Sequence, residues 1–502
     1  MQIAQNKLSS RVSGADFGKV ALWLGFSILV MALALFFGLL AVTANPILVG
    51  LGGGLVVGVF LLMKPDFLIW LILLLGLAAG TFISLAGPQF AKLTWAVSIL
   101  GFILLFLSMF NLLLVGKSRA QPPFIWIGVV FLTVALASTI AQWYSVGEVV
   151  AGVKRLFQTY GLMFAFATLA LSARQVGRYQ KLLLVIALLQ LPFALYEFFV
   201  LVGERGGLAS GSDSTDVVAG TFGANLRGGS PNSVMAVYLL IAMGFLFARW
   251  KEKLLSTPRL VLLVLPMVVV FFLGEVKILF ILIPLAYFVL MKRDIPRRPV
   301  FFLMMTLFAL GFILLLGHLY ATFIINRPID DIIQDTLAYN ATADRGYGQY
   351  VLNRFTVLSF WWQQQGWNDP IALFFGHGLG SAFSAPSVIP GHIAMKWPLY
   401  GIDLTTASSL LWDTGIAGLA LFVLMLGSAW RTCSVLQRES KDARVIADAT
   451  AIQAAITLFG VFVIYNNTLV NHPSMELIVA CVLGYLAYLY RRHRLGVTAA
   501  VS

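Results

Sequence analysis

An acid and a base interrupt one of the long apolar runs of this sequence. Glu275 and Lys277 lie two residues apart within residues 257–291, a run that is otherwise almost free of charge. Charged side chains are costly inside such a run, and those that persist usually line a polar cavity and contribute to binding or catalysis. The pair therefore predicts a functional site in this run.

Two long polar connections supply further candidates. Residues 203–230 are rich in glycine and contain Arg205 and Arg227. Pro231 and Asn232 are expected to start a helix directly afterwards, with Ser230 or Asn232 as its cap. Because a helix N-terminus carries a partial positive charge, an arginine beside it forms a favourable anion site. This connection therefore predicts anion binding.

The second connection, residues 321–404, carries several residues capable of acid–base chemistry or anion binding: Arg354, His377, His392 and Asp403. Long connections in compact proteins usually carry function. A lone histidine is more often structural than catalytic, but four of the five histidines fall on or near one predicted side of the protein. The acids in residues 330–335 lack the spacing of a metal site, and a solvated helix face is the better interpretation.

The elements that position these residues are those of a membrane protein. The chain has 502 residues, of which 60% are hydrophobic and 11% charged. This is too little charge to cover a soluble surface, and apolar runs of membrane-spanning length recur from end to end. We therefore predict an all-α polytopic membrane protein with about 14 transmembrane helices. The expected spans are residues 20–42, 46–63, 67–86, 93–116, 124–142, 152–171, 180–202, 231–249, 259–273, 275–291, 300–320, 405–427, 446–466 and 473–490.

The distribution of Lys and Arg predicts the orientation. With both termini in the cytoplasm, most basic residues fall inside and most acids outside, as the positive-inside rule requires. The net charge of +13 then reports topology, and nucleic acid is a poor interpretation of it. Residues 1–320 are expected to hold eleven helices and the outer loop 203–230. Residues 321–404 form the large outer loop, and residues 405–502 hold three helices and a cytoplasmic tail.

Local patterns refine this arrangement. Residues 257–291 are too long for one span, so we expect two short helices whose tip, with Glu275 and Lys277, lies slightly below the outer surface. Residues 354–365 predict an amphipathic helix on the membrane interface, with an apolar side made of Phe355, Leu358, Trp361 and Trp362. Residues 376–380, with three glycines, predict a flexible joint.

Four motifs in chain order resemble the superfamily of O-antigen ligases and O-antigen or exopolysaccharide polymerases. Arg354, Trp361, Asp369-Pro370 and "FGHGLGSAF" resemble the large periplasmic loop of that family. "GTFGANLRGGSPNSVMAVYL" and "TASSLLWDTGIAGLALF" are similar to its helix starts, and "FLGEVKILF" stands where members usually have "SRG". The resemblance covers about residues 200–427.

This resemblance implies a glycosyltransferase of the C superfamily in a bacterial inner membrane. The donor would be a glycan on undecaprenyl pyrophosphate at the periplasmic side, and a sugar hydroxyl would displace the pyrophosphate without metal or cofactor. The first outer connection, residues 43–45, contains no acid, as expected for a metal-independent enzyme. Expected partners are the lipid-linked glycan, membrane lipids, and chain-length regulator and export proteins.

The resemblance also implies roles for the candidate residues. Lys277, Arg354 and either Arg205 or Arg227 would stabilise the departing pyrophosphate, and Glu275 would position or neutralise Lys277. The base would be His392, Asp403 or no single residue, with Asn232 and His377 as further substrate contacts. Lys277 replaces the family arginine, and Leu404 stands where ligases have a histidine. These departures favour polymerase over ligase.

Two other classes remain open at this point. A lipid-linked oligosaccharide flippase can have as many spans and a cationic cavity, but it has no need for the large outer loop, and here the cations cluster at the outer ends of spans. A non-catalytic assembly subunit is the third possibility. Substitution of Lys277 or Arg354 discriminates between these hypotheses.

Overall fold

The structure is a computed structural model that describes residues 64–87, 94–113, 121–207, 212–226, 231–320, 328, 330–331, 334, 346–347, 350–384 and 390–496. Contacts divide the chain into residues 1–68 and residues 69–502, and nearly all described residues belong to the second unit. The expected spans 20–42 and 46–63, and the candidate Arg227, lie outside the described residues.

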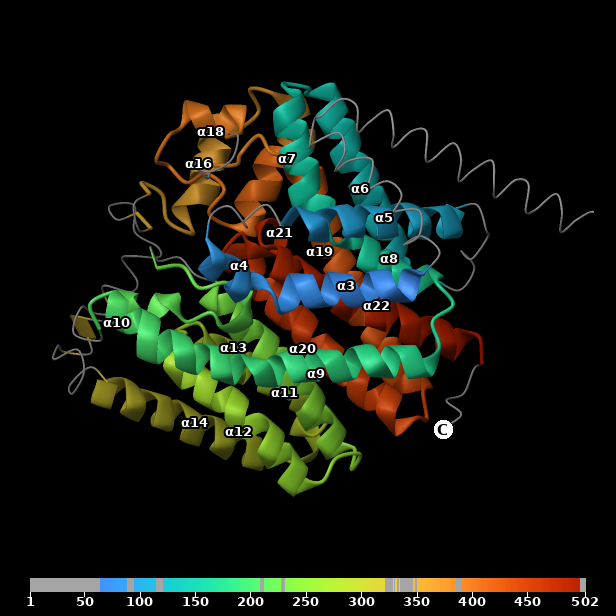
Figure 1. Ribbon diagram of the computed structural model, residues 1–502, viewed down its shortest axis with the longest axis vertical. Helices are drawn as coiled ribbons and strands as arrows, with labels where there is room; N and C mark the ends of the chain where they lie inside the picture. The colour runs from blue at the N-terminus through green and yellow to red at the C-terminus, as the bar shows by residue number, and fades with distance from the viewer. Residues whose placement is uncertain are drawn as a thin grey trace, which may run out of the picture. The chain divides into compact units, whose positions relative to one another are not determined.

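The described part of the chain is helical throughout and has no strands, which confirms the prediction of an all-α membrane protein (Figure 1). Eight of its helices are long and apolar enough to cross a membrane, or nine if a pair bent by 57° forms one broken span. The predicted number of about 14 spans is therefore not confirmed. The spanning candidates are α5 (Thr94–Leu113), α6 (Pro123–Ala141), α9 (Ala173–Tyr196) with its extension to Glu204, α11 (Asn232–Lys251), α12 (Thr257–Gly274), α19 (Thr406–Glu439), α20 (Ala443–Tyr465) and α22 (Pro473–Arg494), and the bent pair is α3 (Pro65–Leu77) with α4 (Gly80–Ala86).

Shorter elements connect or accompany these spans. The helices are α7 (Val146–Phe157), α8 (Tyr160–Thr168), α10 (Val202–Glu204), α13 (Leu279–Met291), α14 (Pro299–Tyr320), α16 (Thr356–Gln365), α17 (Pro370–Phe375), α18 (His392–Lys396) and α21 (Thr468–Asn471). The π turn η2 (Glu197–Leu201) and the 3₁₀ turns η4 (Ser212–Val217), η5 (Gly220–Phe222) and η6 (Ile295–Arg297) complete the set. The hairpin expected in residues 257–291 is present as α12 and α13, with a break around Glu275.

Successive helices bring the basic connections together at one end, which we call the Arg249 end. Arg249 at the end of α11 bonds Asp448 of α20 at 2.7 Å and Gln180 of α9 at 3.2 Å. Arg293 donates to the Gln437 carbonyl of α19 at 2.8 Å. Connections that the sequence assigned to one side therefore do meet in space.

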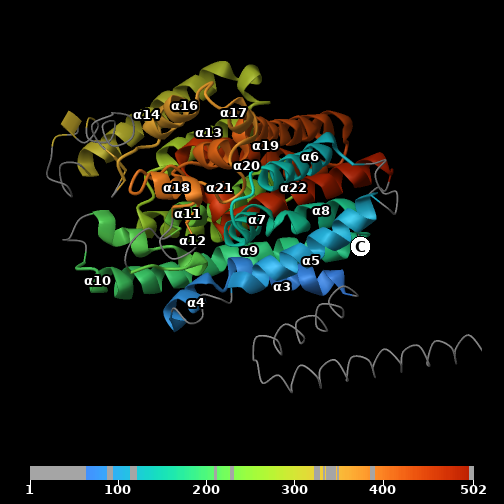
Figure 2. The same ribbon diagram turned by 90° about the horizontal axis from the view of Figure 1, so that it is seen from above.

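The opposite end, which we call the Tyr465 end, collects the starts of α11 and α19 and the end of α20. Asn466 donates to Ser233 at 3.4 Å, and the Asn466 carbonyl accepts the Thr406 backbone N–H at 2.9 Å. In the view of Figure 2, α9, α19 and α22 run between these two ends. The large connection before α19 packs on the Tyr465 end.

The expected span 152–171 is instead two short helices, α7 and α8. In Figure 1, α7 runs across the direction of α5 and α9. The break occurs at Gln158, whose buried side chain accepts the Ser98 hydroxyl at 2.7 Å and donates to Glu476 at 3.1 Å. Because its amide is satisfied by α5 and α22, the chain can turn at this polar residue inside an apolar segment.

The second half of the outer loop 203–230 is tied to α9 by a buried carboxylate. Glu197 is fully buried in the π turn that ends α9, and it accepts the backbone N–H groups of Ala219 and Gly220 at 2.8 and 2.7 Å. The Thr81 hydroxyl contacts the same carboxylate at 3.3 Å. A π turn shifts the register of a helix by one residue, which aims Glu197 at the loop.

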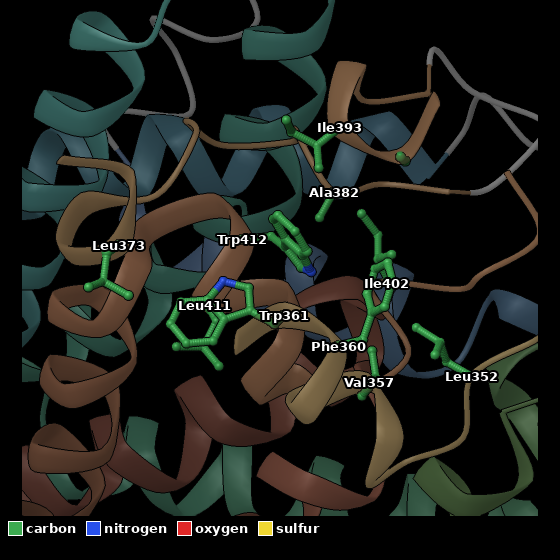
Figure 3. Packing of buried hydrophobic residues seen from close by; sticks show 11 residues of the cluster. Leu352, Val357, Phe360, Trp361, Leu373, Ala382, Ile393, Ile402, Leu411 and Trp412 are labelled. Carbon is green, nitrogen blue, oxygen red and sulfur yellow. The ribbon is translucent and has the colours of Figure 1, made fainter. Parts of the chain in front are cut away.

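The expected amphipathic helix is α16, and only part of its predicted apolar side is buried in the protein. Val357, Phe360 and Trp361 are buried against Leu411 and Trp412 of α19 (Figure 3). Phe355 and Trp362, which were assigned to the same apolar side, are 56% and 49% exposed. The contact with α19 determines which residues of α16 are buried. The sequence of residues 354–365 alone does not predict this contact.

Candidate functional site

The clearest pair of chemically active groups is Glu148 on α7 and His392 at the start of α18. One carboxylate oxygen of Glu148 lies 2.8 Å from Nδ1 of His392, and the other accepts the His392 backbone N–H at 2.9 Å. The His392 ring stacks on Tyr144, with centroids 4.4 Å apart. These contacts hold the ring in one orientation and favour the tautomer with its proton on Nδ1.

The other nitrogen of His392 is available for chemistry. Nε2 has no hydrogen-bond partner among the residues that the structure describes, and the side chain keeps 16% of its surface exposed. A neutral imidazole whose Nδ1–H is held by a carboxylate can accept a proton at Nε2 and share the resulting charge with that carboxylate. His392 therefore has the geometry of a general base.

Glu148 owes its position to the start of α7. Ser145 caps this helix by accepting the Glu148 backbone N–H at 3.2 Å, which places Glu148 in the first turn. An acid in the first turn is stabilised by the positive end of the helix dipole. Both effects keep Glu148 fixed opposite His392.

His377 lies beside this pair. Its ring is nearly perpendicular to that of His392, with centroids 6.3 Å apart, and it stacks on Trp412. Burial is the main reason that the pKa of His377 is lowered to about 4, and the nearby His392 and Lys396 side chains lower it further. His377 is therefore neutral at pH 7, and its Nε2–H donates to the Gln365 side chain at 2.8 Å.

The glycine-rich joint at residues 376–380 is held by Asp413 of α19. The Asp413 carboxylate accepts the backbone N–H of Gly380 at 3.1 Å and the hydroxyl of Ser381 at 2.9 Å. Gly380 has φ 88°, and a Cβ there would lie 2.7 Å from the Glu148 carbonyl oxygen. Glycine is thus required for close packing on α7, and the joint predicted to be flexible is anchored instead.

Arg155 on α7 was not among the sequence candidates. Its Nε donates to Asn471 at 2.9 Å, and its guanidinium carbon lies 3.5 Å from the centre of the Phe383 ring. Burial lowers the pKa of Arg155, and nearby carboxylates oppose this effect. These carboxylates belong to Asp403, Asp413 and Glu476. Arg155 also lines a small pocket with Gly152, Leu156, Ser409, Leu410, Asp413 and Val470.

Asp403 is 5% exposed and fully engaged. Its carboxylate accepts the hydroxyl and the backbone N–H of Ser384, and its carbonyl accepts Asn467 at 2.7 Å and Ser409 at 3.2 Å. Burial raises the pKa of Asp403, while Arg155 and the Ser384 hydrogen bonds act in the opposite direction. These contacts suit a residue that ties the large connection to α19 and α21.

Arg354 lies at the Tyr465 end, directly before α16. Asn353 accepts the backbone N–H groups of Phe355 and Thr356 at 3.1 and 2.9 Å, a local turn that fixes the Arg354 backbone. The Arg354 Nε donates to the Tyr465 carbonyl at 2.7 Å. Its guanidinium lies 4.4 and 4.2 Å from the ring centres of Tyr347 and Tyr465. This cation is therefore held between two aromatic faces.

Three other predicted residues meet on one turn, η4. Arg205 donates to the Ser214 carbonyl at 3.4 Å. The Thr215 hydroxyl bonds Glu275 at 3.4 Å, and Asn232 donates to Asp216 at 3.3 Å. Three consecutive residues of this turn therefore contact Arg205, the α12–α13 tip and the start of α11. The sequence analysis named these three regions separately.

Lys277 stands apart from Glu275. Its side chain is exposed, and among the described residues it forms no ion pair and no hydrogen bond. Glu275 takes a left-handed conformation with φ 44° as α12 ends, and it turns toward Thr215. The expected pairing of Glu275 with Lys277 is therefore wrong, and the ammonium group is open to a ligand.

The sequence contained weak signals for the residues that were missed. Lys154 and Arg155 follow a short amphipathic stretch and precede an apolar one, so they resembled a span boundary. Glu148 is three residues beyond Ser145, the spacing of a capped helix start. The partner of each residue lies far away in the chain, and no local pattern indicates it.

Comparisons with known proteins do not identify a family for this chain. No protein-family model matches this chain, and no curated protein matches it either. Among the described residues, no group of three His, Cys, Asp or Glu side chains is placed to hold a metal ion. Function must therefore be argued from the motifs and from the contacts given above.

Proposed function

We propose that this protein is a bacterial inner-membrane glycosyltransferase. It polymerises oligosaccharide repeat units carried on undecaprenyl pyrophosphate, at the periplasmic side. The hydroxyl oxygen of an acceptor sugar bonds to the anomeric carbon of the donor glycan. The bond from that carbon to the pyrophosphate oxygen breaks, and its electron pair leaves with the lipid pyrophosphate.

The observation that carries this proposal is the contact between Glu148 and His392. Glycosyl transfer to a hydroxyl needs a base that takes the hydroxyl proton as the new bond forms. His392 Nε2 accepts this proton, and the Glu148 carboxylate stabilises the imidazolium that results. Asp403 was the other candidate base, but its carboxylate is buried and already bonded to Ser384.

The second requirement is stabilisation of the departing pyrophosphate. Lys277 supplies an ammonium group without a partner among the described residues, at a break between two helices. Fixed cations in a poorly hydrated site stabilise a developing anion more strongly than water does. Arg354 is held by Tyr347 and Tyr465, and we propose it as a second, fixed cation for the pyrophosphate. Arg205 lies on the loop that contacts the same hairpin tip.

Polymerase is favoured over ligase by the start of α19. The position at which the family's ligases carry a histidine is Leu404, and here the candidate base comes from α18 instead. A ligase that transfers glycan to lipid A core is the alternative that the experiment below must exclude.

The test uses Lys277→Ala and Arg354→Ala in cells that depend on this protein for their polymer. Each variant is expected to abolish long polymer while single repeat units accumulate on lipid at the outer face, because transport precedes the blocked step. Lys441→Ala is the control, since Lys441 is an exposed lysine at the Arg249 end. Membrane fractions should contain each variant at the wild-type level.

Other outcomes would contradict the proposal in different ways. Accumulation of repeat units on the cytoplasmic side indicates a flippase. Normal polymer that is not transferred to its final acceptor indicates a ligase. If both variants make normal polymer and transfer it normally, Lys277 and Arg354 do not form the proposed anion site.

A further inference from the structure

We propose that α17 is inserted in the membrane, with Ile371, Phe374 and Phe375 in contact with lipid hydrocarbon chains. This segment belongs to the large connection, which the sequence placed in water outside the membrane. The inference concerns where the chain lies, and it does not depend on the proposed reaction.

One face of α17 is apolar and uncovered. Ile371, Phe374 and Phe375 are 63%, 43% and 48% exposed, whereas Ala372 and Leu373 on the other face are buried. The three exposed residues have the i, i+3, i+4 spacing of one helix face. Asp369, the nearest acid, turns back to accept the Ala372 backbone N–H at 3.0 Å. Asp369 is exposed, but it precedes the helix, and α17 itself contains no charged residue.

The position of α17 is fixed by α6 and α19. The Ser138 hydroxyl of α6 donates to the Phe375 carbonyl. The residues after α17 bond α19, where the His377 backbone N–H donates to the Trp412 carbonyl at 2.8 Å. Gly415 has φ 66° at a kink of α19, and a Cβ there would lie 2.4 Å from the Phe374 carbonyl carbon. α17 therefore fits into the kink.

Two helices give the depth of this position independently. At about 1.5 Å per residue, Gly415 lies roughly 24 Å along α19 from the exposed Arg431, and Ser138 lies roughly 22 Å along α6 from Pro123. The last turns of α22 belong to the Arg249 end, because Tyr485 of this helix bonds Asp448, the partner of Arg249. Pro123 belongs to the same end, because the neighbouring Gln121 and Arg491 of α22 both donate to the Ala167 carbonyl.

The hydrocarbon layer is about 30 Å thick. An exposed arginine marks its edge, since such a charge cannot remain in hydrocarbon. Both distances therefore place the docking points of α17 inside the layer, near its far edge. If α6 or α19 is tilted, the same length of helix crosses less of the layer, and the docking points of α17 lie farther inside from the far edge.

α6 exposes apolar side chains at the depth where it contacts α17. Leu136 and Ile140 are 42% and 70% exposed on this spanning helix, and Trp143 and Tyr144 follow at 55% and 59%. Aromatic residues directly after a span are typical of the membrane–water interface. Leu136 and Ile140 lie two residues before and after the buried Ser138, so α6 faces lipid at the depth where it bonds α17.

The test attaches a bimane fluorophore to single introduced cysteines in the full chain, reconstituted in phosphatidylcholine bilayers with brominated acyl chains. Both native cysteines are buried, which limits background labelling. Labels at Ile371→Cys and Phe374→Cys should be quenched as strongly as a label at Leu136→Cys on α6. A label at Lys441→Cys should be unaffected by bromine and quenched by aqueous iodide.

Two results would overturn the inference. Quenching of both α17 labels by iodide, without quenching by brominated lipid, would place α17 in water. Protection from both quenchers, together with cross-links between labelled cysteines of two chains, would mean that a second copy covers this face. Because Ile371 and Phe374 are exposed, neither substitution should disturb packing, and the two labels check each other.

Discussion

At the scale of single residues, the Glu148–His392 pair gives the first prediction. His392→Gln should lower the rate of polymer formation by roughly 10²- to 10⁴-fold, because the acceptor hydroxyl loses its base. Glu148→Gln should lower the same rate by a smaller factor, because the imidazolium loses its counter-charge. Steady-state kinetics should show the loss in kcat with KM for the lipid-linked substrate unchanged.

Tyr144→Phe is the matched control for this pair. It retains the ring that stacks on His392 and removes a hydroxyl for which the structure shows no partner among the described residues. Its rate should remain close to that of the wild type. Equal loss of rate in all three variants would indicate that the pair only supports the local fold.

His377 gives a prediction on pH and stability. Its pKa in the folded protein is about 4, below the value of 6.5 for an exposed histidine, chiefly because of burial. The unfolded chain therefore binds more protons between these two values, and stability falls as the pH decreases from about 6.5 to about 4. Thermal unfolding of His377→Gln should depend less on pH across this window than that of the wild type.

Gln363→Ala is the control, because Gln363 is exposed on α16 and carries no titratable group. This control should unfold with the same pH dependence as the wild type. A difference between wild type and His377→Gln that stays constant from pH 7 to pH 4 would contradict the assignment.

At the scale of elements, the kink of α19 is the feature that admits α17. Gly415 has φ 66° and ψ −167°, a conformation that costs side-chain-bearing residues of the order of 1–3 kcal/mol. Gly415→Ala should therefore destabilise the protein by at least this amount, since the added Cβ also meets Phe374. Thermal or denaturant unfolding measures the effect.

Gly427→Ala tests whether the loss is specific to the kink. Gly427 lies on the same helix, and a Cβ there would meet nothing within 4 Å. Alanine has the higher helix propensity, so this variant should be as stable as the wild type or more stable. Similar destabilisation by both substitutions would show that the kink has no special role.

Elements also show how far the sequence could be interpreted. The α12–α13 hairpin was predictable because its length, Gly274 and two flanking charges are all local. The buried face of α16 was not, because Trp361 and Trp362 are equivalent until the contact with α19 selects one. The break at Gln158 depends in the same way on Ser98 and Glu476, which lie on other helices.

The candidate site was predictable only in part for the same reason. Arg354, His392 and His377 are conspicuous as polar residues in a long connection of an apolar chain. Glu148 and Asp413 are partners of that connection, but they come from α7 and α19, far away in sequence. Arg155 resembled the flank of a span. The pocket that Arg155 lines forms only when α7, α19 and α21 pack together.

At the scale of the whole molecule, the chain is a helical membrane protein with distinct ends. The Arg249 end carries basic residues bound to neighbouring helices, and the Tyr465 end carries the large connection and the candidate site. The positive-inside rule predicts that the Arg249 end is cytoplasmic. Under the proposed function, a lipid-linked substrate would reach the site from the opposite face.

The central claim is that this protein forms glycosidic bonds between lipid-linked repeat units. The most direct measurement supplies the purified full chain, in a bilayer, with one undecaprenyl-pyrophosphate-linked repeat unit and no other acceptor. The account predicts a ladder of longer lipid-linked glycans together with released undecaprenyl pyrophosphate, and no ladder with His392→Gln. Transfer of the unit across the bilayer without any new bond, or inertness until a lipid A core acceptor is added, would contradict it.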